Sequence, residues 1–384
     1  MKNILLFCLF GTMVVNTAFS QTDKSWKKVE RKSSLIVNKS VNLDNFPSDF
    51  NLYELDLTSI QQSLFTIVDA GSSKNSNVII TIPNASGKLE RFRMQESSNF
   101  DSALQARFPN IRAFVGQSLD DNHAQIHLSY SPEGIQTMVF RANTGTEYLE
   151  PFSEDKKTYA VHSRDVNYKR KSFTCSTPDE KLEHDLSDKG SILHRSSDLS
   201  LKTFRLAMSV TGEYSAYHGG TTTSVLAAVN ATMTRVNGVY QKDLAIKMNL
   251  VNNTTILYLN AATDPYGPTD AAYNSELQTT LTGVVGEANY DVGHLMSAIG
   301  NNGNAGCIGC VCVDGTKGSG FTTSTAPVGD TFDIDFVVHE FGHQFGGNHS
   351  FSFQENNTVN YEPGSGVTIM GYAGITPYDV APNL

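Results

Sequence analysis

Residues 339–349 read His339-Glu-Phe-Gly-His-Gln-Phe-Gly-Gly-Asn-His349, and this stretch determines what the C-terminal half must look like. His339 and His343 are four residues apart, so on a helix they share one face about one turn apart. Two imidazoles at this spacing can bind one tetrahedral zinc ion. Gly346 follows, and a glycine there can turn the chain sharply, so that His349 returns as a third ligand. The stretch therefore predicts a helix, a turn and a zinc site.

Glu340 lies between the two helical histidines but on a different side of the helix. It is about 100° around the axis from His339, too far to be another ligand of the same face. It can still reach a water molecule in the open coordination position, where zinc lowers the pKa of that water toward ~7. Three protein ligands and one open position are typical of a catalytic zinc site, so we predict that Glu340 is the general base.

A chance match on an ordinary core helix is the alternative interpretation of this motif. The frequencies of His, Glu and Gly in the chain put a chance match on the order of one in 10^4 to 10^5. The preceding residues, Asp333-Ile-Asp-Phe-Val-Val, are acidic and then apolar, as expected where a helix begins. The context therefore favours zinc binding.

The histidine pattern resembles the metzincin signature, whose second hallmark is a methionine-containing turn beneath the metal. Thr368-Ile-Met-Gly-Tyr-Ala-Gly374 would supply this turn, with Met370 under the three histidines. Stretches near residues 204–207, 211–220 and 362–374 are similar to bacterial reprolysin-like peptidases related to the adamalysins. Residue 350 is Ser, where true adamalysins usually carry Asp. The resemblance implies an α/β (α+β) metzincin-like catalytic domain with a mixed sheet, and a zinc metalloendopeptidase that hydrolyses proteins or peptides.

Tyr372 follows Met370 by two residues, a spacing that resembles the turn of astacins and serralysins. In those enzymes a tyrosine approaches the metal, so Tyr372 is a candidate for stabilising the oxyanion of the tetrahedral intermediate. The alternative, which we favour, is a structural tyrosine packed in the turn, because zinc itself can stabilise the oxyanion.

The first residues are typical of a secretory signal. Lys2 precedes an apolar run over residues 4–15, and small residues follow at positions 18 and 20. We therefore expect residues 1–20 to be a cleaved signal peptide and the protein to be secreted. No later stretch approaches the ~20 apolar residues of a membrane-spanning helix.

Residues 21–165 have the pattern of a β-rich domain, which the resemblance implies is the pro-domain of a latent proenzyme. Strands are predicted at 77–83, 124–130 and 134–141, with one helix at 101–108. Residues 166–200 are highly charged and poor in apolar residues, which predicts an exposed linker with processing sites at Arg170, Lys171 or Arg195.

Residues 201–384 mix strands with helices, which predicts one α/β catalytic domain. Helices are predicted at 221–241, 273–287 and 333–345, and strands at 204–210, 244–251, 255–259, 294–299 and 310–313. A substrate is expected to lie along an edge strand near residues 318–324. The sequence ends soon after the methionine turn, so we expect the domain to continue in a longer protein.

Four cysteines follow the predicted signal peptide. Cys175 stands alone before the linker, and its thiolate is a candidate cysteine switch that would fill the open zinc position; a disulfide partner or an idle thiol is the alternative. Cys307, Cys310 and Cys312 could bind a metal, but secretion favours a disulfide among them.

The composition excludes some partners. A net charge of −10 argues against nucleic acid, which needs a basic surface. Asp264, Asp270 and Asp314 lie in Gly-rich or Pro-rich loops and are candidate ligands for Ca²⁺, although no loop has the spacing of a calcium motif. The rival to an enzyme is a non-catalytic, zinc-stabilised extracellular binding or adhesion module. Glu340 argues against this rival, because a purely structural site does not need that carboxylate.

Overall fold

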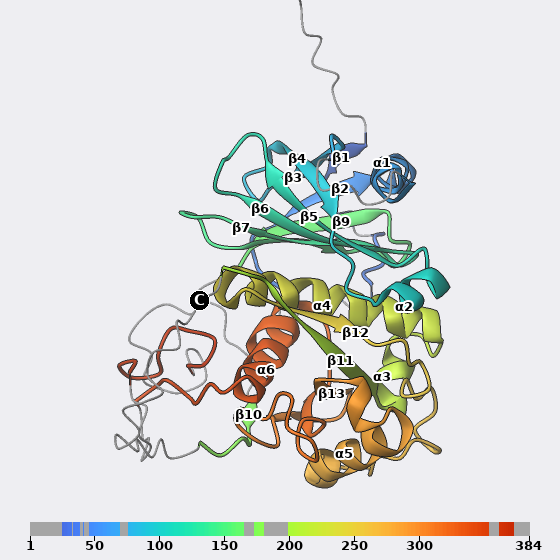
Figure 1. Cartoon of the computed structure of the whole chain (residues 1–384). Coiled ribbons are helices and arrows are strands. Elements are labelled where there is room, and N and C mark those ends of the chain that lie inside the picture. The colour runs from blue at the N-terminus through green and yellow to red at the C-terminus, as the bar shows by residue number, and fades with distance from the viewer. Residues whose placement is uncertain are drawn as a thin grey trace, which may run out of the picture.

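The computed structural model describes residues 25–32, 34–38, 41, 46–69, 76–164, 173–179, 199–352 and 361–371. Two β-sheets lie on opposite sides of one long helix, α4 (Thr222–Leu244), as Figure 1 shows. The first sheet comes from the N-terminal half of the chain, and the second from the C-terminal half together with the short strand β10 (Thr174–Cys175). The predicted signal peptide, Tyr372 and most of the predicted linker lie outside the described residues.

The N-terminal sheet is antiparallel, with nine described strands in the order β1-β2-β9-β8-β7-β6-β5-β4-β3. Their bounds are β1 Trp26–Val29, β2 Asn51–Leu55, β3 Ile79–Pro83, β4 Leu89–Glu96, β5 Arg112–Ser118, β6 Gln125–Ser131, β7 Gly134–Phe140, β8 Glu147–Pro151 and β9 Thr158–Ser163. Two helices accompany it, α1 (Leu57–Asp69) and α2 (Ser102–Arg107). This confirms a β-rich N-terminal region.

Strand β6 shows why this sheet is buried on both faces. Ile126 and Leu128 belong to the core cluster that also contains Leu64 of α1. The intervening His127 points the other way, because a side-chain carbon added to Gly238 of α4 would lie 3.1 Å from its ring. Side chains alternate between the two faces of a strand, so a strand between two helices is buried along most of its length.

The C-terminal sheet is mixed, with six described strands in the order β10-β14-β15-β13-β11-β12. Their bounds are β10 Thr174–Cys175, β11 Lys202–Val210, β12 Ile246–Leu250, β13 Val292–Ser297, β14 Asn301–Asn304 and β15 Gly320–Ser324. Only β14 runs antiparallel to its neighbour β15; the other pairs are parallel. This arrangement confirms the predicted mixed α/β architecture.

Helices cover both faces of the C-terminal sheet. The described helices are α3 Gly212–Tyr217, α5 Tyr273–Val284 and α6 His339–Gln344, the short 3-10 turns η2 Asp270–Ala272 and η3 Glu287–Asn289, and the π-helix η4 Thr331–Val338. Met208 of β11 packs in the cluster that contains α4, whereas its neighbour Ala207 packs in the cluster that contains α5. Helix α4 begins with a capping box between Thr221 and Ser224.

Two predicted strands are wrong. Residues 255–259 form a loop with a single bridge between Leu257 and Val210, because the Asn253 side chain accepts the Thr255 amide and turns the chain there. Residues 310–313 form turns rather than a strand, because Cys310 is tied back to Cys307 by a disulfide and Cys312 has a left-handed backbone with φ of 67°.

Most predicted elements do exist, with shifted ends. The sequence interpretation missed the strands β1, β2, β4, β5, β8, β9, β10 and β14 and the helices α1 and α3. No helix in the described part of the chain is both long enough and apolar enough to cross a membrane.

Candidate active site

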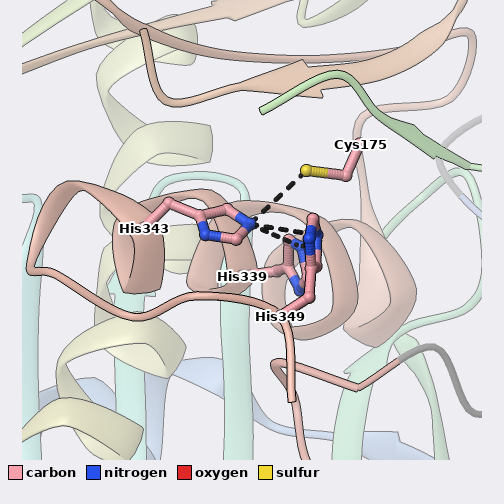
Figure 2. Close-up of side chains that lie close together, drawn as sticks. All are labelled: Cys175, His339, His343 and His349. Carbon is pink, nitrogen blue, oxygen red and sulfur yellow. Dashed lines mark hydrogen bonds between the residues drawn. The ribbon is translucent and has the colours of Figure 1, made fainter. Parts of the chain in front are cut away.

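Three histidines converge beside helix α6, as predicted from their spacing. The Nε2 atoms of His339 and His343 are 3.1 Å apart, and that of His349 lies 3.3 Å from the first and 3.2 Å from the second. All three side chains are buried. Figure 2 shows the rings meeting on one side of α6, with His349 arriving from the following loop.

The outer nitrogen of each ring faces an oxygen acceptor. These contacts join His339 Nδ1 to the Ile369 carbonyl at 2.7 Å, His343 Nδ1 to the Gly347 carbonyl at 2.6 Å, and His349 Nδ1 to Asp179 Oδ2 at 3.1 Å. A neutral imidazole has one proton, and the acceptor fixes it on Nδ1. Burial lowers the pKa of His343 to about 4 and that of His339 well below its usual value, so these two rings are neutral.

The Nε2 atoms of all three rings therefore point at one another, and those of His339 and His343 present lone pairs. A cation bound at their centre would accept these lone pairs. In a tetrahedral zinc site with Zn–N near 2.0–2.1 Å, neighbouring nitrogens are roughly 3.3–3.4 Å apart. The observed separations of 3.1 to 3.3 Å fit this requirement. The residues present are thus able to hold zinc.

Gly346 makes the turn that brings His349 back. Its φ of 104° lies in a region that side-chain-bearing residues rarely adopt. The Gly346 amide donates to the His343 carbonyl at 2.9 Å, and the Gly347 amide donates to the Gly342 carbonyl at 2.8 Å. The chain leaves the helix at this turn, as the sequence predicted.

The predicted helix over residues 333–345 is divided in two. Its first part, η4, has π-helical geometry, and α6 begins at His339. Asp333 and Asp335 in η4 are buried and pair with arginines from two directions: Arg235 on α4 and Arg164 just after β9. π-turns often occur next to functional sites, and this one comes directly before the first histidine.

Glu340 is completely buried next to the histidines. Its Oε2 accepts a hydrogen bond from the Thr177 hydroxyl at 3.0 Å, whereas its Oε1 has no hydrogen-bond partner among the described residues. Burial raises the pKa of Glu340 to about 8, against the opposing effect of its hydrogen bonds. A side-chain carbon on Gly303 of β14 would lie 2.3 Å from Oε1, so this glycine provides the space that the carboxylate occupies.

Cys175 reaches the same point from β10. Its Sγ lies 3.5 Å from His343 Nε2, and the four candidate ligand atoms of Cys175 and the three histidines all lie within 4.8 Å of one another. Figure 2 shows the sulfur directed at the imidazoles. The thiol is not involved in a disulfide, and burial raises its pKa. The structure therefore places the predicted switch residue at the metal site.

The exposed linker predicted over residues 166–200 is not exposed throughout. Phe173 is buried and stacks on Phe336 with ring centroids 3.9 Å apart, and Thr177 is also buried. Strand β10 pairs with β14. Without β10, β14 would be the edge strand of this sheet. Residues 166–172 and 180–198 of the predicted linker lie outside the described part of the chain. The predicted processing sites Arg170, Lys171 and Arg195 are among them.

The expected substrate edge near residues 318–324 is wrong. Strand β15 lies between β14 and β13, so both of its edges are already paired. The edge strand is β14, and residues 174 and 175 occupy its free side. Sequence alone could not show this, because β14 reads Asn301-Asn-Gly-Asn304, with no apolar alternation.

Met370 lies against the active-site helix, as predicted. A side-chain carbon added to Gly342 of α6 would lie 2.3 Å from Met370 Sδ, so the thioether packs directly on the helix. The neighbouring Ile369 carbonyl holds His339, and the Met370 carbonyl accepts the Ser350 amide at 3.1 Å.

Two residues of the site were missed: Thr177, which touches Glu340, and Asp179, which touches His349. No spacing rule could have found them, because they lie more than 160 residues from their partners, with separations of 163 and 170. His218 and His294 are not among the four residues of the ligand cluster.

The candidate calcium ligands gain no support. Asp264 accepts the Gly212 amide, Asp270 accepts from Asn302, and Asp314 pairs with Lys317. Among the described residues, the candidate metal ligands that cluster together are Cys175 and the three histidines.

The disulfide expected in the cysteine cluster joins Cys307 to Cys310, and Cys312 is free and exposed.

The mixed sheet, helix α6 and the three converging imidazoles fit the class of zinc metallopeptidases of the metzincin kind. Residues 200–383 match the family described as metallopeptidase family M12B, reprolysin-like. The C-terminal half of the chain therefore belongs to this family, as the sequence resemblance implied. A search of curated proteins returned no match.

Proposed function

We propose that the protein is a secreted zinc endopeptidase made as a latent precursor. The observation that carries the proposal is the convergence of three buried imidazoles beside a buried carboxylate, in a chain half that belongs to a metallopeptidase family. His339, His343 and His349 would hold the metal, and protein or peptide chains would be the substrates.

In this proposal a bound zinc ion supplies a Lewis acid that polarises the scissile carbonyl and acidifies a water molecule. Glu340 takes a proton from the attacking water and passes it to the leaving amine. Its buried position next to the histidines supports this role, because it places the carboxylate beside the expected metal position. The upward effect of burial on its pKa favours holding the proton until it passes to the amine. Met370 supports the helix from below.

The N-terminal half is proposed to be the pro-domain. Its segment over residues 173–179 occupies the edge of β14 and brings Cys175 to the metal site, which would close the fourth position and keep the precursor inactive. The Cys307–Cys310 disulfide and the apolar N-terminal run support secretion, because disulfides persist in oxidising compartments.

Cleavage of a fluorescently labelled unfolded protein tests the proposal, with the zinc-loaded chain first nicked by limited trypsin and the trypsin then inhibited. The wild type is expected to cleave, and Glu340→Gln to lose at least about a hundredfold in rate, because general acid–base catalysis contributes on that scale. Zinc content should stay equal in both proteins.

Equal cleavage by both proteins would contradict the role of Glu340. A zinc-loaded wild type that never cleaves, but whose melting temperature falls on chelation, would favour the zinc-stabilised binding module instead.

A further inference from the structure

The segment over residues 173–179 contacts more of the site than the metal position. It is anchored at its start by Phe173 on Phe336. Its backbone then follows β14, with the Ser176 amide donating to the Gly303 carbonyl at 2.7 Å. Its last described residues, Thr177 and Asp179, touch Glu340 and His349. Each component of the proposed catalytic apparatus therefore has its own partner in this segment.

Thr177 is held so that its hydroxyl can only donate to Glu340. The Ala305 amide donates to Thr177 Oγ1 at 2.8 Å, which uses the oxygen as an acceptor. The hydroxyl proton is then directed to Glu340 Oε2, 3.0 Å away. Thr177 is only 4% exposed, so water does not compete for this contact. The hydroxyl thus occupies one of the two carboxylate oxygens that could accept a proton from a reacting water.

The Asp179 carboxylate contacts His349 through both of its oxygens. Its Oδ1 accepts the His349 backbone amide at 2.8 Å, and its Oδ2 lies 3.1 Å from His349 Nδ1. Both side chains are buried, at 5% and 3% exposure. A carboxylate on the outer nitrogen of a metal-binding histidine fixes its tautomer and orientation, and losing such a partner typically weakens metal binding 10–100-fold. The Nδ1 atoms of His339 and His343 face carbonyls of the C-terminal half instead. Of these three Nδ1 contacts, only that of His349 is made by the segment over residues 173–179.

We propose that Thr177 and Asp179 are positioning residues of the latent site, and that latency rests on three contacts rather than on Cys175 alone. Thr177 blocks the base, and Asp179 orders the third histidine so that the site binds metal before the segment is removed. This inference rests on the proposed function. It also implies that the precursor holds its zinc more tightly than the enzyme cut on both sides of residues 173–179, because those cuts release the Asp179 carboxylate.

Two measurements on the full-length, zinc-loaded chain test this inference without relying on activity. The first is the alkylation rate of Cys175, followed by mass spectrometry of its own peptide so that Cys312 does not interfere. The second is zinc release to a chromophoric chelator. Thr177→Val and Asp179→Asn keep the shape of each side chain. Ser176→Ala is the matched control, because the Ser176 hydroxyl donates to Asn302 rather than to a histidine or to Glu340.

Thr177→Val is expected to raise the Cys175 alkylation rate about tenfold. The segment that carries Cys175 then loses its buried hydrogen bond to Glu340 and is held less firmly. Asp179→Asn is expected to speed zinc release about tenfold or more. Thr177→Ser should restore the slow alkylation, and Ser176→Ala should resemble the wild type. Circular dichroism melting confirms that each variant is folded.

Wild-type alkylation and zinc release in both folded variants would overturn the inference and leave Cys175 as the sole contact that matters. Failure of the proposed function is seen separately, as absence of cleavage by the trypsin-nicked wild type. That result would not change the alkylation or zinc-release rates.

Discussion

The Glu340 side chain fits into the site because the residue that faces it has no side chain. Gly303 of β14 faces Glu340, and a side-chain carbon there would lie 2.3 Å from Oε1 and 2.6 Å from the carboxyl carbon. Because Gly303 does not have a positive φ, backbone freedom is not the reason for this glycine. The space it leaves lets an acidic side chain pack between the edge strand and the active-site helix.

We expect Gly303→Ala to displace Glu340 and to lower the free energy of unfolding by about 1–3 kcal/mol, the usual cost of an extra methyl group in a packed site. Cleavage by the nicked enzyme should fall more than zinc content does. Chemical denaturation and metal analysis give the two readouts.

Gly283→Ala is the matched control. Gly283 lies in α5, where an added carbon meets nothing within 4 Å, and alanine there should stabilise the helix by up to about 1 kcal/mol. An unfolding free energy for Gly303→Ala equal to that of the wild type would show that Glu340 does not need this space.

At the scale of elements, helix α4 links the two sheets to the active-site helix. Arg235 on α4 bonds Asp333 of η4 at 2.9 Å and Glu150 of β8 at 3.3 Å. The Arg235 and Asp333 side chains are only 2% and 3% exposed, so this ion pair is shielded from water. Removing one partner of such a pair leaves a buried charge without compensation.

Arg235→Met is therefore expected to destabilise the protein by about 3–5 kcal/mol, measured by calorimetry or denaturant unfolding. Arg205→Met, which breaks a pair that is half exposed, should cost no more than about 1 kcal/mol. Similar small losses for both variants would mean that α4 is not held to η4 by this charge pair.

The sequence predicted the elements whose information is local. The spacing of His339 and His343, the glycine at 346 and the apolar period of α4 are each readable within a few residues. Helix α1 was missed although Ile60, Leu64 and Ile67 bury one face at helical spacing, so a signal for it was present.

The contacts of residues 173–179 could not be predicted in the same way. Thr177 and Asp179 meet Glu340 and His349 only because β10 pairs with β14 across the fold. The edge position of β14 has the same origin, because pairing in a sheet depends on the neighbours of a strand rather than on its own residues.

At the scale of the whole molecule, the two halves of the described chain share one hydrophobic core. Phe100, Met138 and Tyr148 of the N-terminal half pack in the same cluster as Met233 and Phe341 of the C-terminal half. Asn99 adds buried hydrogen bonds to Asn230 and Thr234 on α4. A single cut in the linker would therefore leave the halves associated. Release of residues 173–179 does not require this core to separate, because the predicted trypsin sites at Arg170 or Lys171 and at Arg195 lie on both sides of the segment.

Zinc K-edge X-ray absorption of the zinc-loaded, uncut chain tests the central claim most directly. The account predicts three nitrogen neighbours at about 2.0–2.1 Å and one sulfur at about 2.3 Å, with the sulfur lost in Cys175→Ser. A first shell without sulfur would contradict the claim that Cys175 closes the site. A shell without three imidazoles would contradict the zinc peptidase itself.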